Sequence, residues 1–206
     1  GLWLGAGGAR AAVLIAPGES WRYMKGTAEA SSPDRAAWRA TGFNDASWAE
    51  GRVPIFYGEG LDGTLLEDMR GGYTSVFLRR EFTVVNPEAF GELILRAISD
   101  DGFICWINGK EFARYNMPEG DLAFDAASLG ALQEPIPEEV YGTKEPASFL
   151  VPGRNVVAIH AFNASLSGSS DFVIQASLEG FLDETRPVME AIVPAPGALV
   201  RVFNTV

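Results

Sequence analysis

Residues 97–118 read AISDDGFICWINGKEFARYNMP, and this stretch decides the fold. Extended apolar pieces alternate in it with two turns at Gly102 and Gly109, each preceded by Asp or Asn. Glycine reaches positive φ without steric cost, and a preceding Asp or Asn suits the same tight hairpin turns. The pattern therefore predicts a β-meander, with strands at 92–98 and 103–107, inside an antiparallel all-β domain.

The expected strand at 103–107 is apolar on both faces. A strand that is buried on both sides needs a cover over its second face. The long segment 118–148 is the expected cover. It contains four prolines and several acidic residues, so we expect loop and short turns there. Loops of this length inside compact domains are often functional.

Alternating apolar and polar residues mark further strands in the rest of the chain. A strand with one apolar face is typical of a sheet that is buried on one side, as in a sandwich. We expect such strands at 11–15, 19–25, 74–84, 155–162 and 171–178. The sequence therefore predicts an antiparallel β-sandwich with long loops and a few short helical turns.

The chain divides into three parts at changes in composition. Residues 1–18 are expected to be an N-terminal strand or a linker from a preceding region, and residues 19–180 the sandwich itself. Residues 181–206 contain several prolines and are expected to be a linker and the start of a following domain. We expect the chain to begin inside a longer precursor. It has no apolar run long enough to cross a bilayer, so membrane insertion is not expected.

Charge and cysteine content exclude some classes of partner and stabilisation. The formal net charge of −11 disfavours a nucleic-acid partner, because binding to a phosphate backbone requires a basic surface. The single cysteine, Cys105, forms no intrachain disulfide and is expected to be an inert buried thiol. Stability must then come from packing or from bound ions.

Several short motifs together resemble a known family. They are Gly42–Trp48 (GFNDASW), Tyr57–Gly60 (YGEG), Ile107–Arg114 (INGKEFAR) and Pro152–Ala158 (PGRNVVA). The set is similar to galactose-binding-like jelly-roll modules of secreted bacterial multidomain proteins. Relatives include the sugar-binding domain of family 2 glycoside hydrolases and modules found beside lamin-tail or phosphoesterase domains. The resemblance covers about residues 19–180.

This resemblance implies a jelly-roll fold, a secreted or cell-surface location in a bacterium, and an accessory role within a larger protein. Residues 192–200 resemble the start of the immunoglobulin-like domain that often follows such modules. The resemblance names no ligand, because members of this superfamily bind sugars, lipid heads or proteins, or only brace a neighbour. Fold does not settle function.

The adjacent aspartates Asp100 and Asp101 also resemble the turn of PA14-type lectin domains, whose carboxylates hold calcium that in turn grips sugar hydroxyls. Ca²⁺ takes six to eight hard oxygen ligands, of which two neighbouring carboxylates supply several. Asn116, Asp171 or Asp121 would complete the shell if they converge on this turn. The alternative is that the two aspartates only shape a hairpin turn.

Aromatic residues in irregular segments are candidates for stacking on the C–H face of a pyranose ring. The expected ligand-binding residues are Trp38, Tyr57, Tyr115 and Asn116. Loops 26–48, 57–72 and 115–148 would present them at one end of the sandwich. The alternative for each aromatic ring is packing in the core or beneath a loop.

No motif in the sequence indicates catalysis. The only histidine, His160, follows the apolar alternation of its strand and is expected to be a core imidazole. No spacing singles out two carboxylates as a glycosidase pair. We therefore expect a non-catalytic carbohydrate-binding module whose partner is a glycan. The alternative is a structural or adhesive spacer that contacts neighbouring domains and binds no small ligand.

Overall fold

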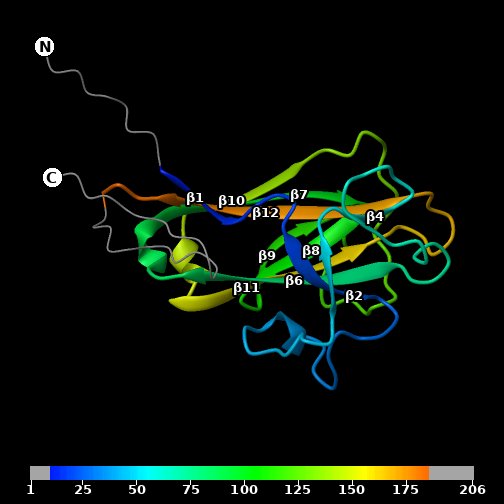
Figure 1. Cartoon of the computed structure of the whole chain (residues 1–206), viewed down its shortest axis with the longest axis horizontal. Helices are drawn as coiled ribbons and strands as arrows, with labels where there is room; N and C mark the ends of the chain where they lie inside the picture. The colour runs from blue at the N-terminus through cyan, green and yellow to red at the C-terminus, as the bar shows by residue number, and fades with distance from the viewer. Residues whose placement is uncertain (1–9, 186–206) are drawn as a thin grey trace, which may run out of the picture.

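The computed structural model describes residues 10–185, which form two stacked β-sheets joined by long loops (Figure 1). The first sheet has the order β10 (Glu139–Thr143), β7 (Phe90–Asp100), β12 (Phe172–Leu182), β4 (Ile55–Tyr57) and β5 (Thr64–Leu65), with β1 (Ala11–Ile15) also paired to β12. The second has the order β3 (Ala49–Arg52), β2 (Ser20–Lys25), β6 (Ser75–Val84), β11 (Gly153–Phe162), β8 (Gly102–Ile107) and β9 (Lys110–Tyr115). Short 3₁₀ turns lie at Ala37–Arg39, Pro87–Ala89 and Pro146–Ser148.

The strand pairings are antiparallel except for the short parallel pair of β4 and β5. The predicted antiparallel β-sandwich is thus confirmed. One of the expected short helical turns is the 3₁₀ turn Ala37–Arg39.

The predicted meander is wrong at its first turn and right at its second. β7 lies in the first sheet and β8 in the second, so the chain crosses between the sheets at Asp101 instead of making a hairpin. β8 and β9 do form a hairpin, and both its turn residues have positive φ: 53° at Asn108 and 82° at Gly109. The same residue types suit a hairpin turn and a crossing, so local sequence does not separate them.

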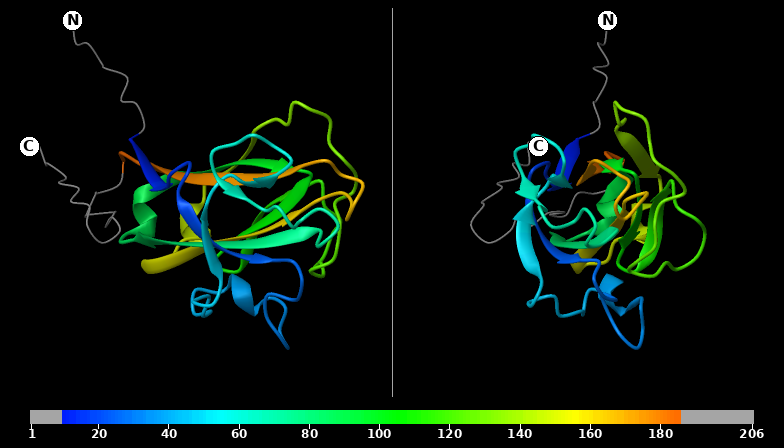
Figure 2. Two further views of the ribbon diagram at one scale, coloured as in Figure 1. Left: turned by 45° about the vertical axis from the view of Figure 1, so that its right-hand side comes forward. Right: turned by 90° about the vertical axis from the view of Figure 1, so that its right-hand side faces the viewer.

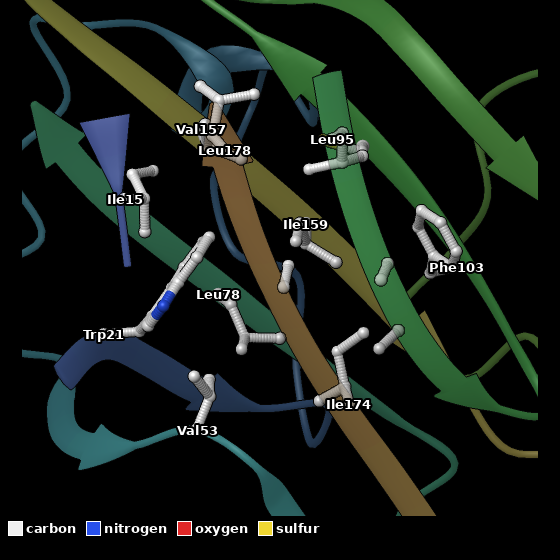
Figure 3. Packing of buried hydrophobic residues seen from close by; sticks show 14 of the residues in the cluster. Ile15, Trp21, Val53, Leu78, Leu95, Phe103, Val157, Ile159, Ile174 and Leu178 are labelled. Carbon is white, nitrogen blue, oxygen red and sulfur yellow. The ribbon is translucent and has the colours of Figure 1, made fainter. Parts of the chain in front are cut away.

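The main core lies between the two sheets and is built from the inward faces of their strands (Figure 3). Trp21, Leu78 and Ile159 from the second sheet meet Leu95 and Ile174 from the first. Each of these side chains is at most 1% exposed. Full burial of one aliphatic side chain contributes on the order of 2 kcal/mol, so this layer accounts for most of the drive to fold.

A second apolar cluster covers the outer face of the second sheet, as the two-faced strand at 103–107 predicted. Ile104 and Trp106 of β8 pack there against Trp38, and Leu122 and Phe124 lie beside them. The segment 118–148 therefore supplies part of the expected cover. The structure differs in one respect, because Glu139–Thr143 is not a loop but the edge strand β10, paired with β7.

The sandwich extends past both expected domain limits. β1 precedes residue 19, yet its Ala11 pairs with Phe181 and its Ile15 with Leu178 of β12, which itself runs to Leu182. The expected start of an immunoglobulin-like domain at 192–200 lies outside the described residues. Within residues 10–185, no helix has the length and apolar character needed to cross a bilayer.

Candidate functional site

Four connections meet at the end of the sandwich opposite to the start of β1 and the end of β12 (Figures 1 and 2). Strand register explains why. Tyr57 at the end of β4 pairs with Phe172, and Asp100 at the end of β7 pairs with Val173. The loop after β4, the crossing after β7 and the loop before β12 therefore begin side by side. The loop between β9 and β10 joins them, because the backbone N–H of its Leu132 donates to Asp101 at the crossing.

Carboxylates from three of these loops converge. The side-chain oxygens of Glu59, Glu134 and Asp171 all lie within 4.8 Å of one another. Glu59 follows β4, Glu134 belongs to the long loop between β9 and β10, and Asp171 precedes β12. Glu59 and Glu134 are exposed and Asp171 is half-buried, so the group opens to solvent on one side.

Asp100 is a buried acid close enough to this group to be affected by its charge. It is 5% exposed, and burial is the main cause that raises the pKa of its carboxyl to about 8. The neighbouring Asp101 carboxyl raises it further, and Asp171 and Glu134 add more negative charge. No N–H donor of the described chain reaches the Asp100 side chain. A buried acid among carboxylates is stable only if it binds a proton or a cation.

Asp101 ties two loops to the crossing between the sheets. One of its oxygens accepts a hydrogen bond from the backbone N–H of Leu132 at 2.8 Å, and the other accepts from Ala164 at 2.6 Å. Its own N–H donates to the carbonyl of Phe162 at 3.0 Å. The peptide bond between Asp100 and Asp101 is cis. Asp101 thus holds the loops that carry Glu134 and Asp171.

Asn116 performs a related positioning role at the end of β9. Its φ is 50°, and its side-chain amide donates to the carbonyl of Asp101 at 3.0 Å and to that of Gly130 at 2.7 Å. Both donors of the amide are engaged inside the loop. Asn116 therefore lies beside the expected aspartates but fastens the loop.

The acidic group fits a hard divalent cation by the type of its donors. Ca²⁺ binds six to eight oxygens and prefers carboxylates and carbonyls in flexible arrangements. Asp100, Glu59, Glu134 and Asp171 would supply carboxylate ligands from four segments. Asp171, one of the expected partners, lies near enough for its charge to act on Asp100.

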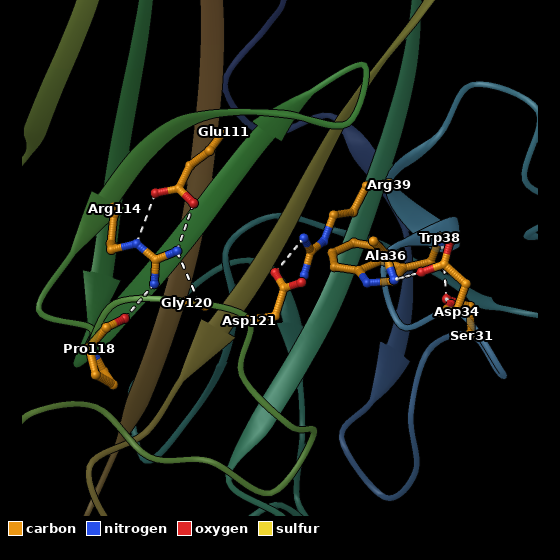
Figure 4. Close-up of polar contacts among 10 residues, drawn as sticks. All are labelled: Ser31, Asp34, Ala36, Trp38, Arg39, Glu111, Arg114, Pro118, Gly120 and Asp121. Atoms are coloured by element: carbon orange, nitrogen blue, oxygen red, sulfur yellow. Dashed lines mark hydrogen bonds and ion pairs between the residues drawn. The ribbon is translucent and has the colours of Figure 1, made fainter.

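Asp121, the other expected partner, lies elsewhere. Its carboxylate pairs with Arg39 at 2.7 Å, on the outer face of the second sheet (Figure 4). The Arg39 guanidinium carbon lies 3.9 Å from the centre of the Trp106 ring. Beside this pair, Arg114 forms an ion pair with Glu111, with 2.7 Å between Nη2 and Oε2. Asp121 serves this surface ion-pair network and contributes nothing to the acidic group.

Trp38 does not offer a ring face to a sugar. It is 1% exposed and packs against Trp48, Phe77 and Trp106, with ring centres 5.1 to 6.1 Å apart. Its backbone N–H donates to the Ser31 hydroxyl oxygen at 3.2 Å (Figure 4). The stacking role expected of Trp38 does not agree with this burial, and the residue is a centre of the second apolar cluster.

The two expected tyrosines are also held by the protein. Tyr57 is 5% exposed, stacks on Phe172 and receives a hydrogen bond from the Asn163 amide at 2.7 Å. Tyr115 is half-buried against Phe103, and burial raises the pKa of its hydroxyl. Tyr57 is thus packed inside the protein, whereas Tyr115 is only partly covered.

Sequence reasoning missed Glu59 and Glu134 as members of the site. Glu59 lies inside the quoted Tyr57–Gly60 motif, and Glu134 lies in an acidic, proline-rich loop. The sequence alone therefore indicated both only as charged surface residues. Their convergence depends on how loops separated by about 75 residues pack. No spacing rule carries that information.

His160 is buried and has the environment of a core side chain. It is 1% exposed, and its ring lies 3.8 Å from those of Phe77 and Phe162. Ser75 donates its hydroxyl proton to the Phe124 carbonyl, so the His160 Nε2–H donates to Ser75 Oγ at 2.9 Å. Burial lowers the pKa of His160 well below its ordinary value. It cannot reach an external substrate as a base.

Comparison with solved structures finds the same fold in parts of sugar-cleaving enzymes. A β-glucuronidase from an uncultured Clostridium species matches with a TM-score of 0.53 and 15% identity, over 88% of this chain and 30% of that one. A calcium-binding mutant of Bacteroides uniformis β-glucuronidase 2 matches with a TM-score of 0.51 and 16% identity, over 83% and 18%. At this identity the likeness shows the fold alone.

The chain spans less than a third of the length of these enzymes. No protein-family model matches the sequence, and no curated protein matches it.

Proposed function

We propose that this chain is a non-catalytic carbohydrate-binding module of an extracellular bacterial multidomain protein, and that Ca²⁺ at its acidic loop end takes part in binding the glycan. One observation carries the proposal. Asp100 is 5% exposed, receives no N–H donor from the described chain, and faces a group of further carboxylates from separate loops. Such a carboxyl needs a proton or a cation, and the arrangement supplies cation ligands.

The residues have distinct roles in this proposal. Glu59, Glu134, Asp171 and Asp100 would hold the ion, and Asp101 fastens the loops that bring them together. Ca²⁺ would supply positive charge and open coordination positions that sugar hydroxyls can fill. The exposure of Glu59 and Glu134 leaves the solvent side of the group accessible to such hydroxyls.

The fold and the size of the chain support an accessory role. The similar structures are glycosidases, and this chain corresponds to only 18–30% of their length. The histidine is buried, and the converging carboxylates share one small volume instead of flanking a cleft. A secreted or surface location and contacts with neighbouring domains follow from the same proposal.

Calorimetry with CaCl₂, and affinity gels containing a panel of polysaccharides with and without EDTA, test the proposal. We expect calcium binding that is weakened at least tenfold in Glu134→Gln, because a ligand of the ion loses its charge. Glu119→Gln is the matched control, since Glu119 is an exposed glutamate of the same loop outside the acidic group. Retention on at least one gel should be lost with EDTA.

A structural spacer is the second candidate, and the burial of Trp38 and Tyr57 favours it. A spacer packs its aromatic rings internally and needs no ligand. Calcium binding without retention on any polysaccharide would support this second function and make the ion a loop brace. Absence of calcium binding would contradict the metal site itself.

A further inference from the structure

A hollow of about 420 Å³ lies against the outer face of the second sheet, where the loop 26–48 leaves β2 and returns to β3 (Figure 1). Pockets of roughly 300–1,000 Å³ are typical of small-ligand sites, so its size suits one. We call it the outer hollow. Its lining residues are Tyr23, Met24, Lys25, Thr27, Ala30, Phe43, Asn44, Ser47, Trp48 and Ala49. None of them belongs to the acidic group at the loop end.

Two limbs of one loop form the walls of the outer hollow. The outgoing limb bends at Thr27, whose backbone N–H donates to the carbonyl of Lys25 at 2.8 Å. The returning limb is fixed by Asp45, whose carboxylate pairs with the buried Arg79 at 2.7 Å and whose carbonyl accepts the N–H of Trp48 at 2.9 Å. The fold therefore holds both walls before a ligand binds, which lowers the entropic cost of binding.

The buried part of the lining is apolar. Ala30 and Trp48 are buried members of the second apolar cluster, and Met24 and Phe43 pack against it. The rings of Phe43 and Trp48 meet with their centres 5.9 Å apart. Met24 and Phe43 stay partly exposed, so a ligand with an apolar face gains by covering them.

The exposed part of the lining is polar and uncharged, and it is formed by Thr27, Asn44 and Ser47. Asn44 Oδ1 accepts the backbone N–H of Ala46 at 3.1 Å. Within residues 10–185, the amide hydrogens of Asn44 have no acceptor, and the hydroxyls of Thr27 and Ser47 have no partner. Hydroxyls donate and accept and an amide NH₂ donates, so these groups match the hydroxyls of a sugar.

The outer hollow offers no free charge. No carboxylate lines it, although the chain has 27 acidic residues. Its one charged lining residue, Lys25, is already paired with Asp68 at 2.6 Å. A second hollow near the end of β12 differs, because its lining includes Glu92, Asp183 and Glu184. The outer hollow therefore suits a neutral ligand.

We infer that the outer hollow is a second glycan-binding site, which binds a neutral pyranose unit without Ca²⁺. The apolar face of the sugar ring covers Met24 and Phe43, and its hydroxyls pair with Thr27, Asn44 and Ser47. The site goes beyond the proposed function, because it shares no residue with the acidic group and needs no metal ion.

Titration of isotope-labelled protein with neutral oligosaccharides in EDTA tests the inference by NMR. The probes are linear oligosaccharides of glucose, xylose, mannose and galactose. We expect at least one probe to shift the backbone signals of Thr27 and Ser47, the side-chain amide signal of Asn44 and the indole N–H signal of Trp48. If no probe shifts these signals in EDTA, the inference is overturned. Tighter binding of an oligogalacturonate than of every neutral probe would overturn it as well.

A double variant, Thr27→Val with Ser47→Ala, removes the two free hydroxyls and breaks no hydrogen bond within the described residues. We expect the affinity for the binding probe to fall about tenfold, because the sugar loses two hydrogen-bond partners. The matched control is Thr41→Val with Ser32→Ala, which removes two hydroxyls of the same loop outside the outer hollow. Unchanged affinity in the first variant, or an equal loss in both, would contradict the site.

Calcium separates this inference from the proposed function. Calorimetry with CaCl₂ reports on the acidic group alone, so a failure there contradicts the proposed function and leaves the outer hollow unaffected. Conversely, sugar binding that occurs only with Ca²⁺ and shifts only signals of the loop end would support the proposed function and overturn the second site.

Discussion

His160 and Arg79 are charged or titratable residue types that the fold buries among aromatic side chains. Arg79 is 0% exposed, and its guanidinium pairs with Asp45 at 2.7 Å and also donates to the carbonyl of Trp38. The sequence alternation puts Arg79 on the outer face of β6, where surface charge is the usual interpretation. The loop 26–48 folds over that face and turns it into a second interior.

His160 provides a prediction at the residue scale. Because burial lowers its pKa below 6.5, the folded protein keeps the ring neutral while the unfolded chain takes up a proton. The stability that the neutral ring contributes is therefore complete above pH 6.5 and is lost as the pH falls below it. The single histidine gives one unambiguous imidazole signal by NMR. We expect no titration of this signal between pH 7.5 and pH 5.

A midpoint near pH 6.5 for that signal would show that the ring is open to water and that the second apolar cluster is not closed. The chemical shift of the ring carbons checks the tautomer independently. The hydrogen bond to Ser75 requires the proton on Nε2.

At the scale of elements, the crossing between β7 and β8 organises the loop end. Asp101 accepts backbone hydrogen bonds from Leu132 and Ala164, which belong to different loops. These bonds are charge-assisted, and each contributes roughly 1.5–3 kcal/mol. The loops that carry Glu134 and Asp171 thus depend on a residue that lies between the two sheets.

Asp101→Asn should release one of these loops while leaving the sandwich folded. An amide has one acceptor oxygen and one donor group, so one of the two backbone N–H groups loses its partner. We expect faster hydrogen exchange at Leu132 or Ala164, with unchanged exchange in β6 and β11. Unchanged protection at both loop amides would contradict the bracing role of Asp101. Ser99→Ala, next to the crossing on β7, is the control.

At the scale of the whole molecule, the free energy of unfolding should depend on pH through the acidic group. The unfolded Asp100 carboxyl ionises near pH 3.8, whereas its pKa in the fold is about 8. The folded state therefore binds more protons, and its stability falls as the pH rises between these values. Ca²⁺ competes with that proton, so it stabilises more at high pH.

Thermal unfolding in EDTA and in CaCl₂ measures this coupling. We expect the increase in Tm caused by Ca²⁺ to be larger at pH 8 than at pH 5. Asp100→Asn should abolish most of the calcium response and weaken the pH dependence in EDTA. A calcium response of equal size at both pH values would contradict the assignment of Asp100 to the site. Comparison with the variant is essential because other groups, such as Asp68 with its lowered pKa, act in the opposite direction.

The sequence alone determined the all-β class, most strands and the hairpin at Asn108–Gly109. These features follow from period-two alternation and from turn residues, which are local properties. Only the tertiary structure decided that β7 and β8 belong to different sheets, and that Trp38 and Arg79 lie in an interior. It also decided that Glu59 and Glu134 meet Asp171, because loop packing over long sequence distances, and not residue spacing, brings these charges together.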